Sequence, residues 1–182
     1  MLGGAAGDAL GGLGQITSAT QMSLFTAEGL LRGQVRFWTK GIGPIYSLMV
    51  GHSYLRWVQT QIPDIDVDVH KDGWLYKVPG LHANRTPDRV SIMALKSLRE
   101  LGQNQDMTFV QAKNNSRGCG GVIRIATVGL ATSKPVSLRM ASRYAVIAIT
   151  PSLTPSRSPC LRSGAIACRT ALMLQLPCWL GW

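Results

Sequence analysis

The segment ITSATQMSLFTAEGLLR, residues 16–32, decides the fold of this chain. From Gln21 to Arg32, apolar or small residues recur at helical spacing on one face and beside it: Met22, Phe25 and Gly29, then Leu24, Ala27 and Leu31. A 3.6-residue period of this kind predicts an amphipathic helix. Thr20 or Ser18 is expected to cap its first turn, because a hydroxyl oxygen can accept a hydrogen bond from a free backbone N–H there.

Further helices are predicted on both sides of this segment. Residues 46–61, YSLMVGHSYLRWVQTQ, form one candidate, which Pro63 ends. Residues 87–102, PDRVSIMALKSLRELG, have Pro87 near the start, apolar residues at 92, 95 and 98, and a glycine at the end, which is typical of a helix. The sequence therefore predicts an all-α fold.

The first residues, GGAAGDALGGLG (3–14), repeat glycine at positions 3, 7 and 11. This spacing leaves one face of a helix nearly bare, so we expect another helix to pack closely against it. The alternative is a dinucleotide-binding loop, which needs a preceding strand, and only two residues precede Gly3. The packed helix is the favoured interpretation.

Composition fits a globular protein with one core or two small ones: 182 residues, 46% of them hydrophobic and 15% charged. The net charge of +10 raises the possibility of nucleic-acid binding. All nine acidic residues, however, lie at or before Asp106, and the excess of positive charge lies after it, where Phe109 and Tyr144 are the only aromatic residues as far as Leu176. A basic surface for nucleic acid usually interleaves aromatic residues, so this distribution argues against such a partner.

The sequence shows no signal for a membrane or for secretion. No window reaches about 18 uninterrupted apolar residues, and MLGGAAGDAL lacks the basic start of a secretory signal. Four cysteines without a CxxC pair indicate neither a disulfide framework nor a zinc site. We therefore expect a cytoplasmic protein.

Several polar clusters contain residue types that occur in metal or catalytic sites. DIDVDVHKD (64–72) has Val69 and Leu75 where a calcium loop needs glycine and glutamate, so a solvated loop is expected. The histidines at 52, 70 and 82 have no metal-ligand spacing.

NNSRGCGG (114–121) is a glycine turn in which Cys119 has no acid or histidine nearby in sequence to activate it as a nucleophile. Arg124, in the apolar segment after this turn, is expected to form a structural ion pair or to contact a pyrophosphate.

The amino-acid composition of the chain changes near residue 148. TPSLTPSRSPCLRSG and the residues after it are rich in Ser, Pro, Arg and Cys, and no helical or strand period runs through them. We divide the chain into a domain at 1–147 and an irregular basic tail at 148–182. The tail is expected to be a linker or disordered; an out-of-frame reading of the gene is the alternative.

Four segments in order resemble the ADP-ribosylglycohydrolase family over residues 2–147. GGAAGDALG resembles its opening helix, and ITSATQMSLFTAEGLLR resembles its first metal motif, which typically reads ITDDTQM. GHSYLRWVQTQ with DGWLYKVPGLHANRTPDRV resembles its middle part, and NNSRGCGGVIRIATVGL resembles its glycine turn. The resemblance implies an all-helical core and hydrolysis of the N-glycosidic bond of ADP-ribosylated arginine. It also implies two divalent cations, Mg²⁺ or Mn²⁺, held by carboxylates and threonine hydroxyls.

The resemblance also implies which residues form the site. Thr17 and Thr20 match the metal motif, whereas Ser18 and Ala19 occupy the positions of its two aspartates, and no aspartate follows Asp106 to supply a second acidic motif. The substrate contacts carried over are Ser116, Gly118, Cys119, Gly120 and Gly121, with Asp8 and Arg124 as supporting residues.

We therefore expect hydrolysis to be impaired or lost and the entrance at 17–20 to be a former metal site that still caps a helix. The implied partner is ADP-ribose or an ADP-ribosylated protein. Three alternatives stay open: a non-catalytic ADP-ribose binder, a non-functional gene remnant, and a basic nucleic-acid-binding protein.

Overall fold

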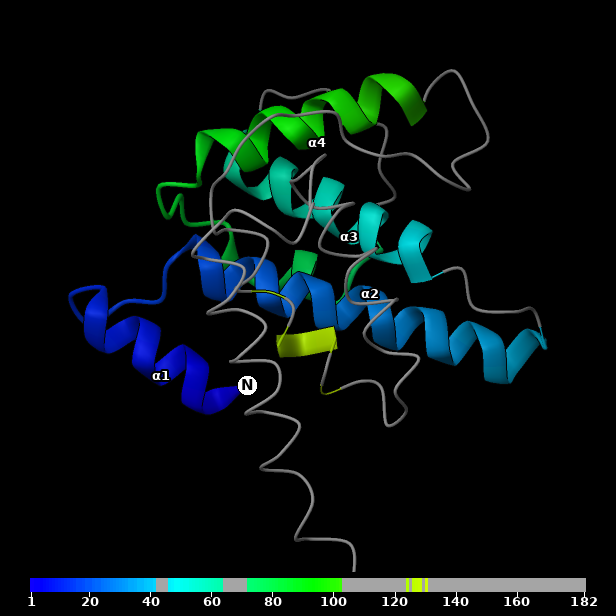
Figure 1. Cartoon of the computed structure of the whole chain (residues 1–182), viewed down its shortest axis with the longest axis horizontal. Coiled ribbons are helices and arrows are strands. Elements are labelled where there is room, and N and C mark those ends of the chain that lie inside the picture. Colours follow the sequence, from blue (N-terminus) through cyan, green and yellow to red (C-terminus); the bar gives the residue numbers. More distant parts are fainter. Residues whose placement is uncertain (42–45, 64–71, 103–123, 125, 129, 131–182) are drawn as a thin grey trace, which may run out of the picture.

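The computed structural model describes residues 1–41, 46–63, 72–102, 124, 126–128 and 130 (Figure 1). Between residues 1 and 102, the described part forms four α-helices and two short 3₁₀ helices: α1 (Leu2–Gly11), α2 (Ser18–Lys40), α3 (Tyr46–Gln61), η1 (Leu75–Lys77), η2 (Pro79–Leu81) and α4 (Arg89–Gly102). None of the described residues forms a strand, so the all-α prediction is confirmed. No helix in this part of the chain is both long enough and apolar enough to cross a membrane.

The core lies between α2 and α3, which run side by side, with α4 packed on α3 (Figure 1). Phe25 of α2 and Val50 and Trp57 of α3 are completely buried there. A Cβ atom built on Gly29 would lie 2.6 Å from the Cα of Val50, so the two backbones approach closely at this glycine. Met22, Phe25 and Gly29 of the face predicted for residues 21–32 are therefore buried, and Gly29 is part of it for a steric reason. Leu31, which was expected beside this face, is 56% exposed, so the prediction is wrong at that residue.

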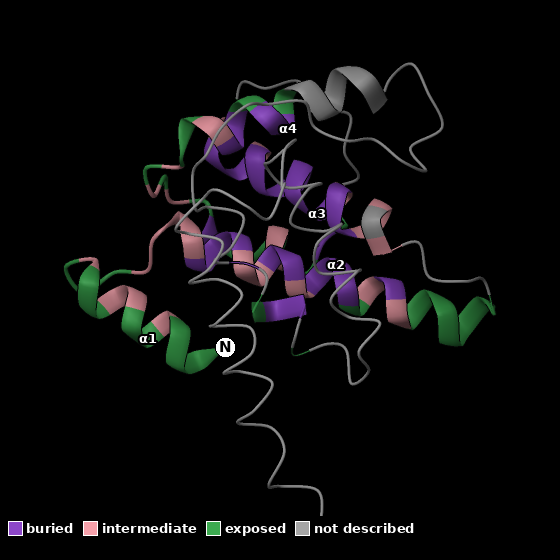
Figure 2. Cartoon of the chain, viewed as in Figure 1, coloured by how far each residue is buried: buried purple, intermediate pink, exposed green. Residues whose placement is uncertain are grey.

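Helix α2 is longer than the predicted 21–32. It begins at Ser18 and continues to Lys40, where Gly41 adopts a left-handed conformation (φ 64°) and ends it. The buried pattern stops at Gly33, and residues 35–40 are exposed, as the green end of α2 in Figure 2 shows. The apolar period therefore marked the packed part of the helix. The end of the helix depends on Gly41, because glycine readily adopts the left-handed conformation that ends it.

Helix α1 forms as predicted, but the expected close partner is not found in the described part of the chain. None of its residues is buried, and a Cβ atom on Gly3, Gly7 or Gly11 would meet nothing within 4 Å among the described residues. Leu2 and Leu10 are 89% and 86% exposed (Figure 2). The expectation that another helix covers the bare face is therefore wrong for the described residues, since a glycine face permits close packing but does not supply the partner.

The segment from Asp72 to Asp88 crosses from α3 to α4 through η1 and η2. Leu81 is buried against the core. Residues 124, 126–128 and 130 are helical, and Val128 is buried in the same hydrophobic cluster as residues of α2, α3 and α4. The apolar segment after the glycine turn, of undecided type from sequence, is thus helical where it is described.

Candidate functional site

The entrance of α2 is formed by residues 17–20, the segment singled out as a former metal motif. Thr17 is the N-cap: its backbone is extended (φ −93°, ψ 180°), and its Oγ1 accepts a hydrogen bond from the N–H of Ala19 at 3.2 Å. The prediction that Thr20 or Ser18 caps the helix is therefore wrong. Both lie inside the first turn, and a cap must have the non-helical backbone that only Thr17 has.

This assignment gives a test that separates neighbouring hydroxyls. Thr17→Ala removes the cap and the contacts of Thr17 with α1, so we expect it to lower the free energy of unfolding by about 1–2 kcal/mol. Ser18→Ala is the matched control and should change it by less than about 0.5 kcal/mol. Urea denaturation of both variants provides the measurement. Equal losses would show that the cap is not at Thr17.

The carboxylate of Asp8 in α1 lies on this entrance. Its Oδ2 accepts hydrogen bonds from the N–H of Thr17 at 2.7 Å and from the hydroxyl of Thr20 at 2.6 Å. The hydroxyl of Thr17 donates to the same carboxylate, at 2.8 Å to Oδ1 and 3.0 Å to Oδ2. Burial acts to raise the pKa of Asp8, but the hydrogen bonds from Thr20 and Thr17 outweigh it and hold this pKa below its ordinary value.

The entrance does not fit two divalent cations. Two such ions carry four positive charges, and the only carboxylate that the described residues bring to the entrance, that of Asp8, is already engaged by three donors. Ser18 and Ala19 add no charge, and hydroxyl oxygens alone neutralise a hard cation poorly. Among the described residues no group of three histidine, cysteine, aspartate or glutamate side chains could hold a metal ion.

The other described carboxylates have structural partners elsewhere. Asp88 accepts hydrogen bonds from the N–H groups of Val90 and Ser91 at 3.3 Å and so caps α4. Asp72 pairs with Arg32, 2.6 Å from Nη2 to Oδ2, and this hydrogen bond is the main cause that lowers the pKa of Asp72. Glu28 is buried beside Arg56. None of these three is placed as a replacement for the missing aspartates.

The buried pair of Glu28 and Arg56 is a feature that sequence reasoning missed. The two residues are 2% and 3% exposed, and Oε2 of Glu28 lies 4.0 Å from Nε of Arg56. Oε1 of Glu28 accepts hydrogen bonds from the N–H groups of Trp74, at 2.5 Å, and Leu75, at 3.4 Å. Burial lowers the pKa of Arg56, while Glu28 and Asp72 act to raise it.

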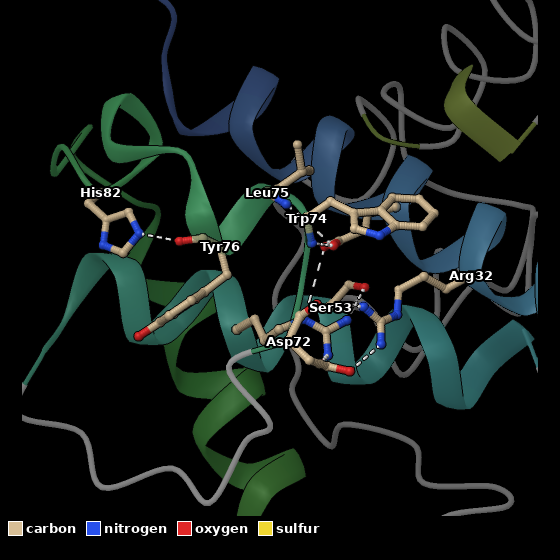
Figure 3. A network of polar contacts seen from close by, with 9 residues as sticks. Arg32, Ser53, Asp72, Trp74, Leu75, Tyr76 and His82 are labelled. Atoms are coloured by element: carbon tan, nitrogen blue, oxygen red, sulfur yellow. Dashed lines mark hydrogen bonds and ion pairs between the residues drawn. The ribbon is translucent and has the colours of Figure 1, made fainter.

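Figure 3 shows the surroundings of this pair. Arg32 and Asp72 meet beside it, and Ser53 accepts a hydrogen bond from Nη2 of Arg56 at 3.0 Å. Further along the same segment, the ring of His82 contacts the carbonyl oxygen of Tyr76 at 2.7 Å. The contacts of Glu28, Arg32 and Arg56 anchor residues 72–75 on α2 and α3, whereas the contact of the His82 ring with Tyr76 lies within the segment itself.

The end of this segment is held next to the entrance. The side chain of Gln21, completely buried, donates to the carbonyl oxygen of Ala83 at 3.1 Å and accepts from Nε1 of Trp57 at 3.2 Å. Arg85 donates from Nη1 to the side-chain oxygen of Gln15, just ahead of the entrance. Gln21 was not predicted as a site residue, and the structure gives it a role in joining α2, α3 and the 81–85 turn.

Arg124 is buried behind the core, 4% exposed. Its Nη2 donates to the hydroxyl of Ser91 at 3.2 Å, and its guanidinium lies 5.4 Å from the centre of the Tyr54 ring, a cation–π contact. Burial lowers its pKa, while Tyr54 and Asp88 act to raise it. The described contacts of Arg124 therefore join this part of the chain to α3, through Tyr54, and to α4, through Ser91.

The remaining predicted residues are not brought together by the described part of the chain. The substrate contacts Ser116, Gly118, Cys119, Gly120 and Gly121 lie outside the described residues, as do His70 and the expected domain boundary at 147. The described site thus consists of Asp8, Thr17 and Thr20 at the entrance of α2, with Ser18 and Ala19 in its first turn.

Fold and entrance together define an all-helical protein with a polar site at the start of its longest described helix. The family model of the ADP-ribosylglycohydrolases matches residues 1–152, most of the chain. The chain belongs to the ADP-ribosylglycohydrolase family. Neither the search of curated proteins nor that of solved structures found a match. Hydrolysis that releases ADP-ribose is the reaction type of this family, and its members act on ADP-ribosylated substrates.

Proposed function

We propose that this chain is an ADP-ribosylglycohydrolase in which metal-dependent hydrolysis of ADP-ribosylated arginine is impaired or lost. The observation that supports the proposal is the charge of the entrance. Ser18 and Ala19 stand in its first turn, and the carboxylate of Asp8 is committed to Thr17 and Thr20. ADP-ribose on a modified protein is the proposed ligand, and a reducing cytoplasmic compartment is the proposed setting.

The chemistry explains why the missing acids matter. Cleavage of an N-glycosidic bond develops positive charge on the ribose and needs an activated water. In the family, Mg²⁺ or Mn²⁺ among carboxylates would orient the ribose hydroxyls and activate this water. The described residues at the entrance supply the three hydroxyls of Thr17, Ser18 and Thr20 and one carboxylate that is already hydrogen-bonded, so they can neither neutralise such ions nor replace a general base.

A hydrolysis assay tests this proposal. The full chain is incubated with an ADP-ribosylated arginine substrate and Mn²⁺, and release of ADP-ribose is measured. We expect no release above the uncatalysed background. Restoring both acids, with Ser18→Asp and Ala19→Asp, should not restore turnover either, because no aspartate follows Asp106 to form the second acidic motif.

A titration with free ADP-ribose accompanies the assay as a check that the ligand site exists. Binding without turnover fits an impaired hydrolase of this family. Substantial manganese-dependent hydrolysis by the natural chain or by the double variant would overturn the proposal. Circular dichroism melting of each variant shows whether a lack of turnover comes from a lack of folding.

A further inference from the structure

The last part of α2 extends beyond the helix that packs against it. The hydroxyl of Tyr46 in α3 donates to Oε1 of Gln34 at 2.5 Å, and among the described residues no hydrogen bond joins residues 35–40 to another element. These residues are all exposed, and they lie on the opposite side of the molecule from α1 (Figures 1 and 2). Packing of the described core therefore does not explain their side chains.

Three exposed apolar side chains of this part of α2 share one face of the helix. Leu31, Val35 and Trp38 are spaced by four and three residues, so they lie one above another. All three are exposed, and Trp38 is 73% exposed. A single exposed apolar residue is normal, whereas an aligned row of them that ends in a tryptophan indicates a contact surface.

A row of basic side chains runs along the helix beside the apolar row. Arg32, Arg36 and Lys40 follow one another at four-residue spacing. Arg32 is paired with Asp72, whereas Arg36 and Lys40 are exposed and have no carboxylate partner among the described residues. The sequence has no aspartate or glutamate at 29–63. This surface is therefore both apolar and cationic, and it complements a partner that is apolar and anionic.

We propose that this α2 end surface, formed by Leu31, Val35, Arg36, Trp38 and Lys40, binds the surface of an anionic lipid bilayer. Helices with basic residues beside Trp and Leu lie in the bilayer interface, where the apolar side chains enter the headgroup boundary. A tryptophan suits this depth because its ring is apolar and its N–H is polar. Binding of this kind needs no spanning helix, and none of the described helices could span a membrane.

Charge and position favour a bilayer over a second copy of this chain. A symmetric pair of copies would place Arg36 and Lys40 opposite the same basic residues, and like charges repel. The helix end reaches past α3 and α4, so a flat surface can contact it (Figure 1). The entrance lies at the other end of α2, about 30 Å away along the helix. Hydrolysis and bilayer binding are therefore separate properties, and either can fail alone.

Sedimentation of the full chain with vesicles provides the test. We expect binding to vesicles of phosphatidylcholine with phosphatidylglycerol, much weaker binding to phosphatidylcholine alone, and a loss of binding as salt is raised. Trp38→Ala should lower the partition coefficient about tenfold, because the ring no longer leaves water. Leu10→Ala, at a highly exposed apolar residue of α1, is the control and should leave it unchanged.

The basic row has its own pair of variants. Arg36→Gln with Lys40→Gln should lower the partition coefficient about 30-fold, since each basic residue near an anionic surface contributes about fivefold. Arg89→Gln with Lys96→Gln makes the same charge change at exposed positions of α4 and should lower it far less. Binding that no α2 variant weakens would come from the basic residues after Asp106 and would overturn the proposal.

Quenching of tryptophan fluorescence by lipids with brominated acyl chains identifies the residue that enters the bilayer. The natural chain should be quenched, whereas Trp38→Phe keeps an apolar ring and should retain binding but lose the quenching. Unchanged quenching in Trp38→Phe contradicts the proposal. So does a concentration-dependent dimer that Trp38→Ala abolishes while the natural chain binds no vesicles. Circular dichroism melting checks that each variant folds, which we expect because every substituted side chain is exposed.

Discussion

Gly29→Val is expected to destabilise the chain by about 3 kcal/mol or more, enough to unfold a marginal domain. A Cβ atom at position 29 would lie 2.6 Å from the Cα and 2.9 Å from the backbone nitrogen of Val50, and 3.0 Å from the carbonyl oxygen of Met49. These are backbone atoms of α3, so no side-chain rotation relieves the overlap. The two helices must separate, which opens the core around Phe25 and Trp57.

Chemical denaturation followed by far-ultraviolet circular dichroism measures this effect. Gly4→Ala is the matched control, because a Cβ atom there meets nothing within 4 Å among the described residues. Alanine is the better helix former, so this variant should gain about 0.5–1 kcal/mol. If both variants retain the stability of the natural chain, the backbones of α2 and α3 are not in close contact at Gly29.

The sequence predicted the helices well and their surroundings less well. A 3.6-residue period reports which side chains a helix buries, so the face with Phe25 and Gly29 was visible in the pattern. The period gives no information on how closely two helices approach, and it therefore did not show that the backbones of α2 and α3 meet at Gly29. For the same reason the bare face of α1 indicated where a helix would fit but not whether one lies there.

The cap illustrates a second limit. Thr17, Ser18 and Thr20 all have a hydroxyl that can cap a helix, and composition does not choose among them. The choice depends on which residue keeps an extended backbone, and at Thr17 this conformation is held by Asp8, nine residues away. A contact such as that of Asp8 with Thr17, which joins two helices across the turn between them, leaves no periodic pattern in the sequence.

The absence of acidic residues from the first turn of α2 was readable from the sequence because it is a matter of residue types. Ser18 and Ala19 lack charge in any conformation, and the resemblance to the family motif is the basis for expecting two aspartates there. The contacts of Asp8 were only partly accessible, as a supporting role at the entrance. The pair of Glu28 and Arg56 was missed, because one charge on an apolar helix face resembles an imperfect pattern, and its partner lies on another helix.

That pair gives the second large effect: Glu28→Ala should lower the free energy of unfolding by about 3–5 kcal/mol. Arg56, 3% exposed, would keep its charge in the interior, and among the described carboxylates only that of Asp72, 3.6 Å from Nη1, would remain beside it. The N–H groups of Trp74 and Leu75 would lose their acceptor as well. The segment 72–75 would then detach from α2.

A graded series identifies the cause of this loss. Glu28→Gln keeps an oxygen for the N–H of Trp74 but removes the charge, so it should lose less than Glu28→Ala. Replacing both members, with Glu28→Met and Arg56→Met, should recover much of the stability, because no buried charge is left uncompensated. Thermal melting of the three variants, with Trp74 fluorescence as a local probe, provides the comparison.

Arg32→Ala is the control at the exposed edge of the same network. Its partner Asp72 has a side chain that is 56% exposed, and an ion pair so close to water contributes about 0–1 kcal/mol. A loss in Glu28→Ala no larger than in Arg32→Ala would show that the interior of the network contributes no more than its surface. The larger loss is expected because water can solvate Asp72 when its partner is removed but cannot reach Arg56 without opening the contact between α2, α3 and residues 72–75.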